Sequence, residues 1–197
     1  MAAPPTASRQ APAGAGFYTI GHSTRSLDEF VALLAEAGVK RLLDIRTVPR
    51  SRRNPQFNLD TLPAALAAHG IAYEHVAALG GLRGRSKTVA PEVNGFWEND
   101  SFHHYADYAL TPEFAAALDQ VVAQGRHERC ALMCAEAVWW RCHRRIVADH
   151  LLARGERVLH ILGPGHVEPA QLTAGAQVQG MHARPVVTYP GGAPAAT

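Results

Sequence analysis

Cysteine is scarce in this chain, and long apolar runs are absent from it. Three cysteines in 197 residues, without regular spacing, do not suggest the disulfide framework of a small secreted protein. No apolar run reaches the roughly 18 residues that a membrane-spanning helix requires. Residues 1–16 are rich in Ala, Pro and Gly but lack the continuous apolar region of a signal peptide. We therefore expect a disordered leader over 1–16 and a cytoplasmic protein that has no membrane contact.

A strong charge of either sign is also lacking. Lys and Arg total 19 and Asp and Glu total 17, and the resulting net charge of +2 does not by itself indicate a nucleic-acid-binding protein. Basic residues nevertheless gather in two loop-like stretches, which contain Arg46, Arg50, Arg52, Arg53, Arg83, Arg85 and Lys87. We expect residues 50–56 and 83–100 to rim the same cleft, because each stretch follows the carboxyl end of an expected strand. Aromatic residues lie near these stretches in the sequence, a combination that suits a nucleotide base or single-stranded nucleic acid.

Apolar, β-branched runs alternate along the chain with segments of helical periodicity. The expected strands are 17–20, 41–47, 71–76, 130–134 and 158–162. Helices are expected to begin near Ser26, Leu59, Thr111 and Cys142. This alternation predicts an α/β fold, a three-layer sandwich in which helices flank a mostly parallel sheet of about five strands.

The chain length favours one domain. We expect a single α/β domain over 17–172, with a long irregular stretch from about 78 to 101. The periodic pattern fades beyond 163. We therefore expect 173–197, which includes Tyr189, to be a partly irregular tail or a late addition to the sheet edge.

Three polar segments follow expected strands directly: Gly21-His22-Ser23, Asp44-Ile45-Arg46 and Cys134-Ala135-Glu136. In parallel sheets, ligands bind outside the carboxyl ends of the strands. We therefore expect these segments to meet at one edge of the sheet.

Four motifs carry a family resemblance: Thr19-Ile20-Gly21-His22-Ser23, Asp44-Ile45-Arg46 with Pro49 and Ser51, Leu79-Gly80-Gly81, and Cys134-Ala135-Glu136 followed, after five intervening residues, by Cys142-His143-Arg144. In this order they resemble the domain-of-unknown-function 488 family over about 17–172. The resemblance implies a compact α/β domain of bacterial and archaeal cytoplasm, and it supplies no reaction. Trp139 and Trp140 lie between the two halves of the last motif, where they bear on ligand specificity.

The stretch from Cys134 to Arg144 is expected to be a strand end, a loop and a helix start. A helix start presents free N–H groups that favour an anion, and Arg141 and Arg144 add donors suited to phosphate. The same field favours a thiolate at Cys134 or Cys142. Arg141 lies one position too far from Cys134 for the usual phosphatase loop, so the sequence does not indicate a phosphatase. The alternative is that these cysteines are buried core residues, as we expect of Cys130.

The other segments at this edge also allow two roles each. His22 could move a proton or bind phosphate, or it could be satisfied by the backbone in a turn that precedes Ser26. Asp44 could orient Arg46 or His22, or it could form an internal ion pair.

Zinc accepts thiolate and imidazole ligands, which Cys134, Cys142, His143 and either His22 or His160 could supply. We expect Cys142 and His143, as neighbours on one helix, to point in different directions. The favoured expectation is therefore a site without a metal or other cofactor, with zinc as the alternative. A reversible disulfide between Cys134 and Cys142 is open if the two sulfurs approach each other.

The sequence thus favours a protein that binds a phosphate-bearing ligand, a nucleotide or nucleic acid, with thiol-dependent hydrolase or transferase chemistry. The expected catalytic residues are Cys134, Glu136, His143 and His22. The expected ligand-binding residues are Arg46, Arg141, Arg144, Ser23, Asp44, Cys142, Arg52 and Arg83. The alternatives are a non-catalytic nucleic-acid-binding module and a metal-stabilised domain.

Overall fold

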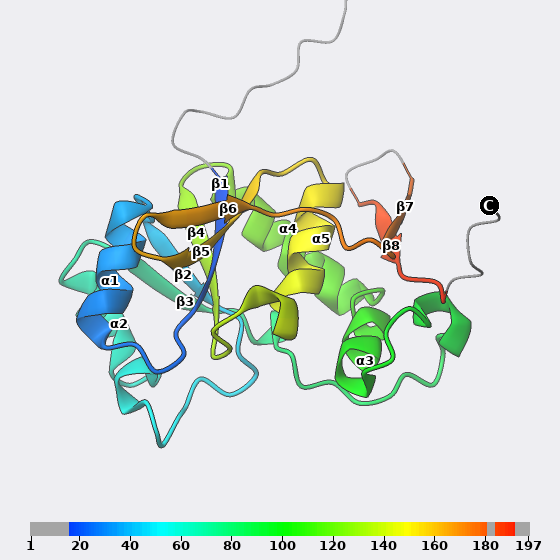
Figure 1. Ribbon diagram of the computed structural model, residues 1–197, viewed down its shortest axis with the longest axis horizontal. Helices are drawn as coiled ribbons and strands as arrows, with labels where there is room; N and C mark the ends of the chain where they lie inside the picture. The colour runs from blue at the N-terminus through cyan, green and yellow to red at the C-terminus, as the bar shows by residue number, and fades with distance from the viewer. Residues whose placement is uncertain (1–15, 181–183, 192–197) are drawn as a thin grey trace, which may run out of the picture.

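The computed structural model describes residues 16–180 and 184–191, and a six-stranded sheet forms its centre (Figure 1). The strand order is β3-β2-β4-β1-β5-β6, and all neighbouring strands are parallel except β5 and β6. The strands are β1 (Gly16–Gly21), β2 (Arg41–Asp44), β3 (Ala72–His75), β4 (Arg129–Cys134), β5 (Val158–Gly163) and β6 (His166–Pro169). The five predicted strands are confirmed, and β6 adds an antiparallel edge strand where the sequence pattern fades.

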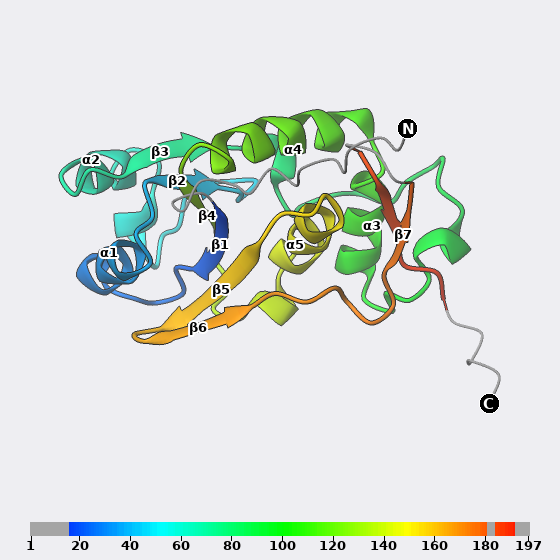
Figure 2. The same cartoon turned by 90° about the horizontal axis from the view of Figure 1, so that it is seen from above.

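Helices cover both faces of this sheet, as the three-layer prediction requires. The helices are α1 (Leu27–Glu36), α2 (Leu62–Ala67), α3 (Asp100–Tyr108), α4 (Pro112–Gly125) and α5 (Arg144–Ala153). Alternate strand residues serve the two faces: Leu42 packs with α1 and α2, whereas its neighbour Leu43 packs with α3, α4 and α5. Figure 2 shows α1 and α2 on one side of the sheet and α4 and α5 on the other.

Local signals explain where the helices begin. The Ser26 hydroxyl accepts from the Glu29 N–H, and the Glu29 carboxylate accepts from the Ser26 N–H, which together form the predicted capping box of α1. Thr111 caps α4 in the same way by accepting from the Phe114 N–H, with Pro112 in the first turn. These caps satisfy N–H groups that a helix start otherwise leaves unpaired.

The chain between β3 and α4 is more regular than expected. Helix α3 begins at Asp100, where the Asn99 side chain accepts from two backbone N–H groups. Two short 3₁₀ helices also lie in this interval, at Ala77–Leu79 and Pro91–Asn94. Two further 3₁₀ helices lie elsewhere in the described chain, at Pro55–Phe57 and Trp139–Arg141.

The tail also contains order. Strands β7 (Gln177–Gln179) and β8 (Val186–Thr188) form a small antiparallel sheet. Tyr189, which we expected in a partly irregular tail, is fully buried, and its hydroxyl donates to Asp149 of α5 at 2.8 Å. Strands β7 and β8 pair with each other and do not extend the central sheet. Most of the expected leader, 1–15, lies outside the described residues. In the described part of the chain, no helix has the length and apolar character needed to cross a membrane.

The topological switch point of the sheet lies between β1 and β4, and it determines where the site forms. These strands are neighbours, yet the helices that follow them, α1 and α5, cover opposite faces. The loops after the two strands therefore separate and leave a crevice at the carboxyl edge. The register pairs Gly21 with Cys134 and Asp44 with Met133, so the three polar segments meet at this edge as predicted.

Candidate functional site: a thiol and histidine cluster in a basic cavity

A cavity of about 750 Å³ opens at the carboxyl edge of the sheet. That volume lies in the range of small-molecule sites. The predicted site residues that line it are His22, Ser23, Arg46, Cys134, Glu136, Arg141, Cys142 and His143. The predicted residues that do not line it are Asp44, Arg52, Arg83 and Arg144.

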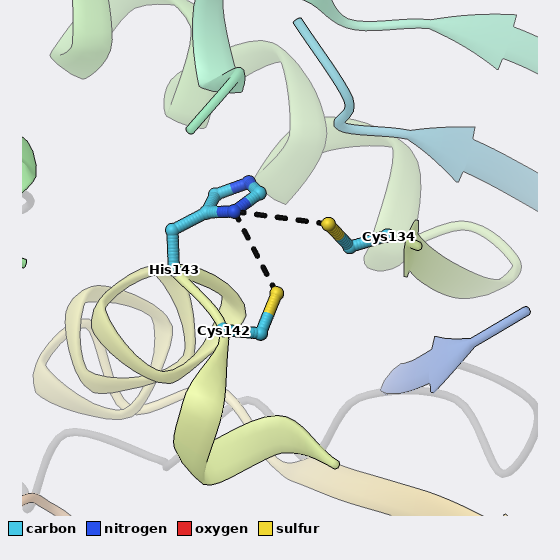
Figure 3. Close-up of side chains that lie close together, drawn as sticks. All are labelled: Cys134, Cys142 and His143. Atoms are coloured by element: carbon cyan, nitrogen blue, oxygen red, sulfur yellow. Dashed lines mark hydrogen bonds between the residues drawn. The ribbon is translucent and has the colours of Figure 1, made fainter. Parts of the chain in front are cut away.

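Two thiols and one imidazole meet in this cavity (Figure 3). Cys134 ends β4, whereas Cys142 and His143 come from the turn that precedes α5. The Nδ1 atom of His143 lies 3.8 Å from Sγ of Cys134 and 3.6 Å from Sγ of Cys142. The Nε2–H of His143 donates to the Ile45 carbonyl oxygen at 3.0 Å, so the ring is fixed with Nδ1 toward the sulfurs.

The two thiols have opposite electrostatic environments. A hydrogen bond from the Cys142 thiol is the largest cause that lowers the pKa of Cys134, and His143 and the charge of Arg144 lower it further, against the effect of burial. Burial and the neighbouring Cys134 thiolate raise the pKa of Cys142. The Cys134 thiol therefore ionises more readily than the Cys142 thiol, which keeps its proton.

Helix α5 begins two residues later than predicted, and this changes the geometry of the cluster. His143 is its N-cap, and Cys142 has an extended backbone with φ −132° and ψ 146°. The expectation that Cys142 and His143 point apart on one helix was wrong, because neither residue lies inside the helix. Their side chains instead converge on Cys134.

This convergence gives the cluster the donor set of a metal site. The three ligand atoms lie within 4.8 Å of one another, and no fourth ligand of this kind joins them among the described residues. An imidazole that donates its other N–H to a backbone carbonyl is common among zinc ligands. The cluster could thus hold one thiophilic ion with a coordination position left open toward the cavity.

A buried ion pair lies beside the cluster. Arg46 donates to both carboxylate oxygens of Asp44, at 2.8 and 2.5 Å, and Tyr73 donates to the same carboxylate at 2.7 Å. Asp44 is fully buried and does not line the cavity, so its position favours orienting Arg46 over the ligand contact that we predicted. Arg46 itself reaches the cavity wall.

His22 is held in its neutral form by this arrangement. Its Nδ1–H donates to the Ser23 carbonyl oxygen at 2.9 Å, so Nε2 faces the Arg46 guanidinium at 3.3 Å as an acceptor. Burial is the main cause that lowers the pKa of His22, and its ring stacks on Phe57 with centroids 4.4 Å apart. One face of the ring and both of its nitrogens are therefore engaged, which favours a role in positioning Arg46.

Arg144 lies behind the cavity wall, which corrects its predicted contact with the anion. It is 1 % exposed, and within the described structure its guanidinium makes one long hydrogen bond, from Nη2 to the Ala137 carbonyl at 3.4 Å. Its Nε and Nη1 atoms have no hydrogen-bond partner. A buried guanidinium with no carboxylate partner acts on its surroundings through its charge, and that charge favours the Cys134 thiolate.

Only one of the two basic loops borders the cavity. Arg50, Ser51, Arg53 and Asn54 line it, whereas residues 85–91 line a separate cavity of about 1070 Å³ beside α3. The prediction that both loops rim one cleft was therefore wrong for the second loop.

Arg83, which we predicted to bind ligand, also lies outside this cavity. Its guanidinium lies 3.6 Å above the ring of Tyr108 and donates to the carbonyls of Ala77, Ala78 and Gly80. These contacts fix its loop against α3 and leave it outside the cavity.

Sequence reasoning missed two residues that hold His143. The Tyr105 ring packs edge-on against the imidazole with centroids 4.9 Å apart, and its hydroxyl donates to the Leu79 carbonyl at 2.7 Å. Gly81 lies so close that a Cβ atom there would fall 2.5 Å from Nδ1 of His143. Asn99 is a helix-capping residue type, so the sequence could have revealed the start of α3. No local signal in the sequence shows that Tyr105 of α3 contacts His143.

The tryptophans between the two halves of the motif lie outside the cavity lining. Trp139 stacks on His160 with centroids 4.4 Å apart and donates to Glu168 at 2.8 Å. Trp140 is 47 % exposed. Trp139 thus fixes the loop to β5 and β6 rather than selecting the ligand.

The fold and this edge define an α/β protein with an open parallel sheet and a thiol–histidine site at its topological switch point. Within that class, the chain belongs to the family described as domain of unknown function DUF488, whose model matches residues 26–151. No curated protein and no solved structure matches the chain. The match includes the Cys134, Cys142 and His143 cluster and begins just after the Gly21-His22-Ser23 turn.

Proposed function

We propose that this protein is a thiol-dependent hydrolase or transferase that acts on a phosphate-bearing ligand. One observation carries the proposal: the Cys134 thiol, with the Cys142 thiol and the His143 imidazole within 4.8 Å, lies in a cavity whose charged lining is mainly arginine. Free cysteines fit a reducing compartment, which supports a cytoplasmic setting.

The charge of the lining supports an anionic ligand. Arg50, Arg53 and Arg141 are exposed around the cavity, and Glu136 is the one carboxylate among the described lining residues. Guanidinium groups bind phosphate through paired hydrogen bonds. The volume accommodates a nucleotide or the end of a nucleic-acid strand.

The proposed roles follow from position. The Cys134 thiolate attacks an electrophilic centre of the ligand, and Glu136, exposed in the loop after β4, exchanges a proton with the leaving group or with water. His143 and Cys142 hold the thiolate, while Ser23 and the arginines bind the anionic group. His22 and Asp44 orient Arg46.

Adjacent arginines offer a matched test of ligand binding. Arg53 lines the cavity and Arg52 does not, although both are exposed in the same loop. By calorimetry with AMP and inorganic pyrophosphate, Arg53→Glu should weaken binding about tenfold or more, the usual effect of losing a charged hydrogen bond. Arg52→Glu should have a much smaller effect. Equal effects of the two variants, or no binding by the parent protein, would refute the proposed site.

Exposure of Arg50, Arg52 and Arg53 on one loop favours a second candidate, a non-catalytic nucleic-acid-binding module. Such a module should bind single-stranded RNA with an affinity that falls steeply with salt. Binding would then be unchanged by Cys134→Ser and weakened equally by Arg52→Glu and Arg53→Glu. This pattern separates the two candidates.

The compact cluster of Cys134, Cys142 and His143 favours a third candidate, a metal-stabilised domain. Elemental analysis of the purified protein decides it. One equivalent of zinc, together with a fall in melting temperature upon chelation, would support this candidate.

A further inference from the structure

The two cysteines of the cavity differ in access, and they are close together. Cys134 is 8 % exposed and Cys142 is 3 % exposed, and both line the cavity. Their sulfur atoms and Nδ1 of His143 all lie within 4.8 Å of one another. Figure 3 shows both side chains directed toward the same imidazole nitrogen.

Neither cysteine lies inside a helix. Cys142 is held in an extended turn before α5, outside the hydrogen-bonded body of the helix, and Cys134 is the last residue of β4. Side-chain rotation at a strand end and in a turn does not disturb a helix or sheet ladder. The third cysteine, Cys130, lies at the other end of β4 and packs in the core away from the cavity.

We propose that Cys134 and Cys142 form a redox-active pair that hydrogen peroxide converts to a disulfide. A more accessible thiol in a cavity, with a second thiol close beside it, is an arrangement in which the first sulfur is oxidised and the second resolves it. The conversion would protect Cys134 from irreversible oxidation and would stop its chemistry until a reductant restores it.

The chemistry balances in two steps. The Cys134 thiolate attacks one oxygen of hydrogen peroxide, the O–O bond breaks, and the departing hydroxide takes up a proton to become water. Cys134 is then a sulfenic acid. The sulfur of Cys142 attacks the sulfur of Cys134, the S–O bond breaks, and the Cys142 proton leaves with the hydroxide as a second water. The two thiols have lost two electrons, and the peroxide has gained them.

This inference shares the Cys134 thiolate with the proposed function but requires neither the arginines nor a phosphate-bearing ligand. The two ideas can therefore fail separately. Loss of anion binding with intact disulfide formation would remove only the proposed function, whereas anion binding without a disulfide would remove only the redox pair.

The test is mass spectrometry of the unreduced protein after chelation of metals and exposure to hydrogen peroxide. In the parent protein and in the control variant Cys130→Ser, we expect a peptide crosslinked through Cys134 and Cys142 that a dithiol reductant removes. Cys134→Ser and Cys142→Ser should each lose the crosslink, with near-ultraviolet circular dichroism used to verify their folding. In Cys142→Ser, Cys134 should instead react with a sulfenic-acid probe and proceed to the sulfinic acid.

Two results would overturn the inference. The first is oxidation of Cys134 to sulfinic acid in the parent protein as fast as in Cys142→Ser, which would show that Cys142 does not resolve it. The second is a metal ion that survives chelation on these residues and keeps both thiols reduced in peroxide.

Discussion

His143 donates its Nε2 proton to the carbonyl oxygen of Ile45 at 3.0 Å, and this bond directs Nδ1 at the two thiols of the cavity. The bond joins the loop after β2 to the start of α5, so the imidazole is fixed from outside its own helix. Stabilisation of the Cys134 thiolate and binding of a metal ion both depend on this orientation, because each would use Nδ1.

Removing the imidazole should make Cys134 a less acidic thiol. In His143→Gln, loss of the hydrogen bond and charge of His143 should raise the pKa of Cys134, so the midpoint of its alkylation profile should move to higher pH. The measurement is iodoacetamide labelling of metal-free protein across a pH series. His103→Gln, beside the second cavity, serves as control and should leave the midpoint unchanged. An unchanged midpoint in His143→Gln would contradict the assigned contact.

Glycine is required at position 21 because the end of β1 lies very close to the loop that follows Cys134. A Cβ atom there would fall 1.8 Å from the Glu136 carbonyl oxygen, so Gly21→Ala must displace the loop after Cys134. We expect a loss of about 1–3 kcal/mol in the free energy of unfolding, the usual cost of overpacking, and weaker AMP binding. Gly84→Ala is the matched control, because nothing lies within 4 Å of a Cβ there. Chemical denaturation of both variants checks this, and equal stabilities would count against the described loop contact.

The charge of Arg144 should stabilise the Cys134 thiolate, and its unpaired buried donors should lower the free energy of unfolding. Arg144→Met removes unpaired buried donors, so we expect an unchanged or higher free energy of unfolding, by up to about 3 kcal/mol, together with a higher alkylation midpoint for Cys134. The neighbouring Arg145→Met should behave in the opposite way. Arg145 donates to Thr173 and lies over the Trp97 ring, so its loss should lower stability and leave the thiol unchanged. A destabilised Arg144→Met protein with normal labelling would show that Arg144 is a structural residue.

Two buried histidines should make the protein sensitive to acid. Burial lowers the pKa of His150 to about 3 and that of His160 to about 4. Between these values and about 6.5, the unfolded chain binds protons that the folded chain does not, so stability should fall as pH is lowered, by about 1.4 kcal/mol per unit and histidine. His150→Phe should reduce this slope, and the exposed His127→Gln should not. Denaturation between pH 6.5 and 4 measures it, and an identical slope in His150→Phe would contradict the assigned burial effect.

The parallel sheet was predictable because its signals are local. Apolar runs mark β1 to β5, the Ser26 and Glu29 pair marks the start of α1, and the position of Cys134 after a buried strand places it at the carboxyl edge. The carboxyl ends of parallel strands lie at the same edge of a sheet, so the sequence was sufficient to predict that Gly21, Arg46 and Cys134 lie close together.

The side-chain geometry of the site was not predictable in the same way. The sequence placed Cys142 inside a helix, and a shift of two residues in the helix start reversed the conclusion about its direction relative to His143. The separation of Arg53 from Arg52, and of Arg144 from the cavity, depends on which side of a loop or helix faces the sheet. Such details are decided by packing between distant segments, as in the contact of Tyr105 with His143.

Alkylation of Cys134 across a pH series, with and without inorganic phosphate, tests the central claim most directly. Mass spectrometry would follow Cys130 and Cys142 in the same sample as internal references. We predict that Cys134 labels well below the pH of about 8.5 at which an ordinary thiol ionises, that phosphate protects it, and that both reference cysteines stay unlabelled in the native protein. Labelling of Cys134 only near that ordinary pH, or equal labelling with and without phosphate, would contradict the account of a reactive thiolate in an anion-binding cavity.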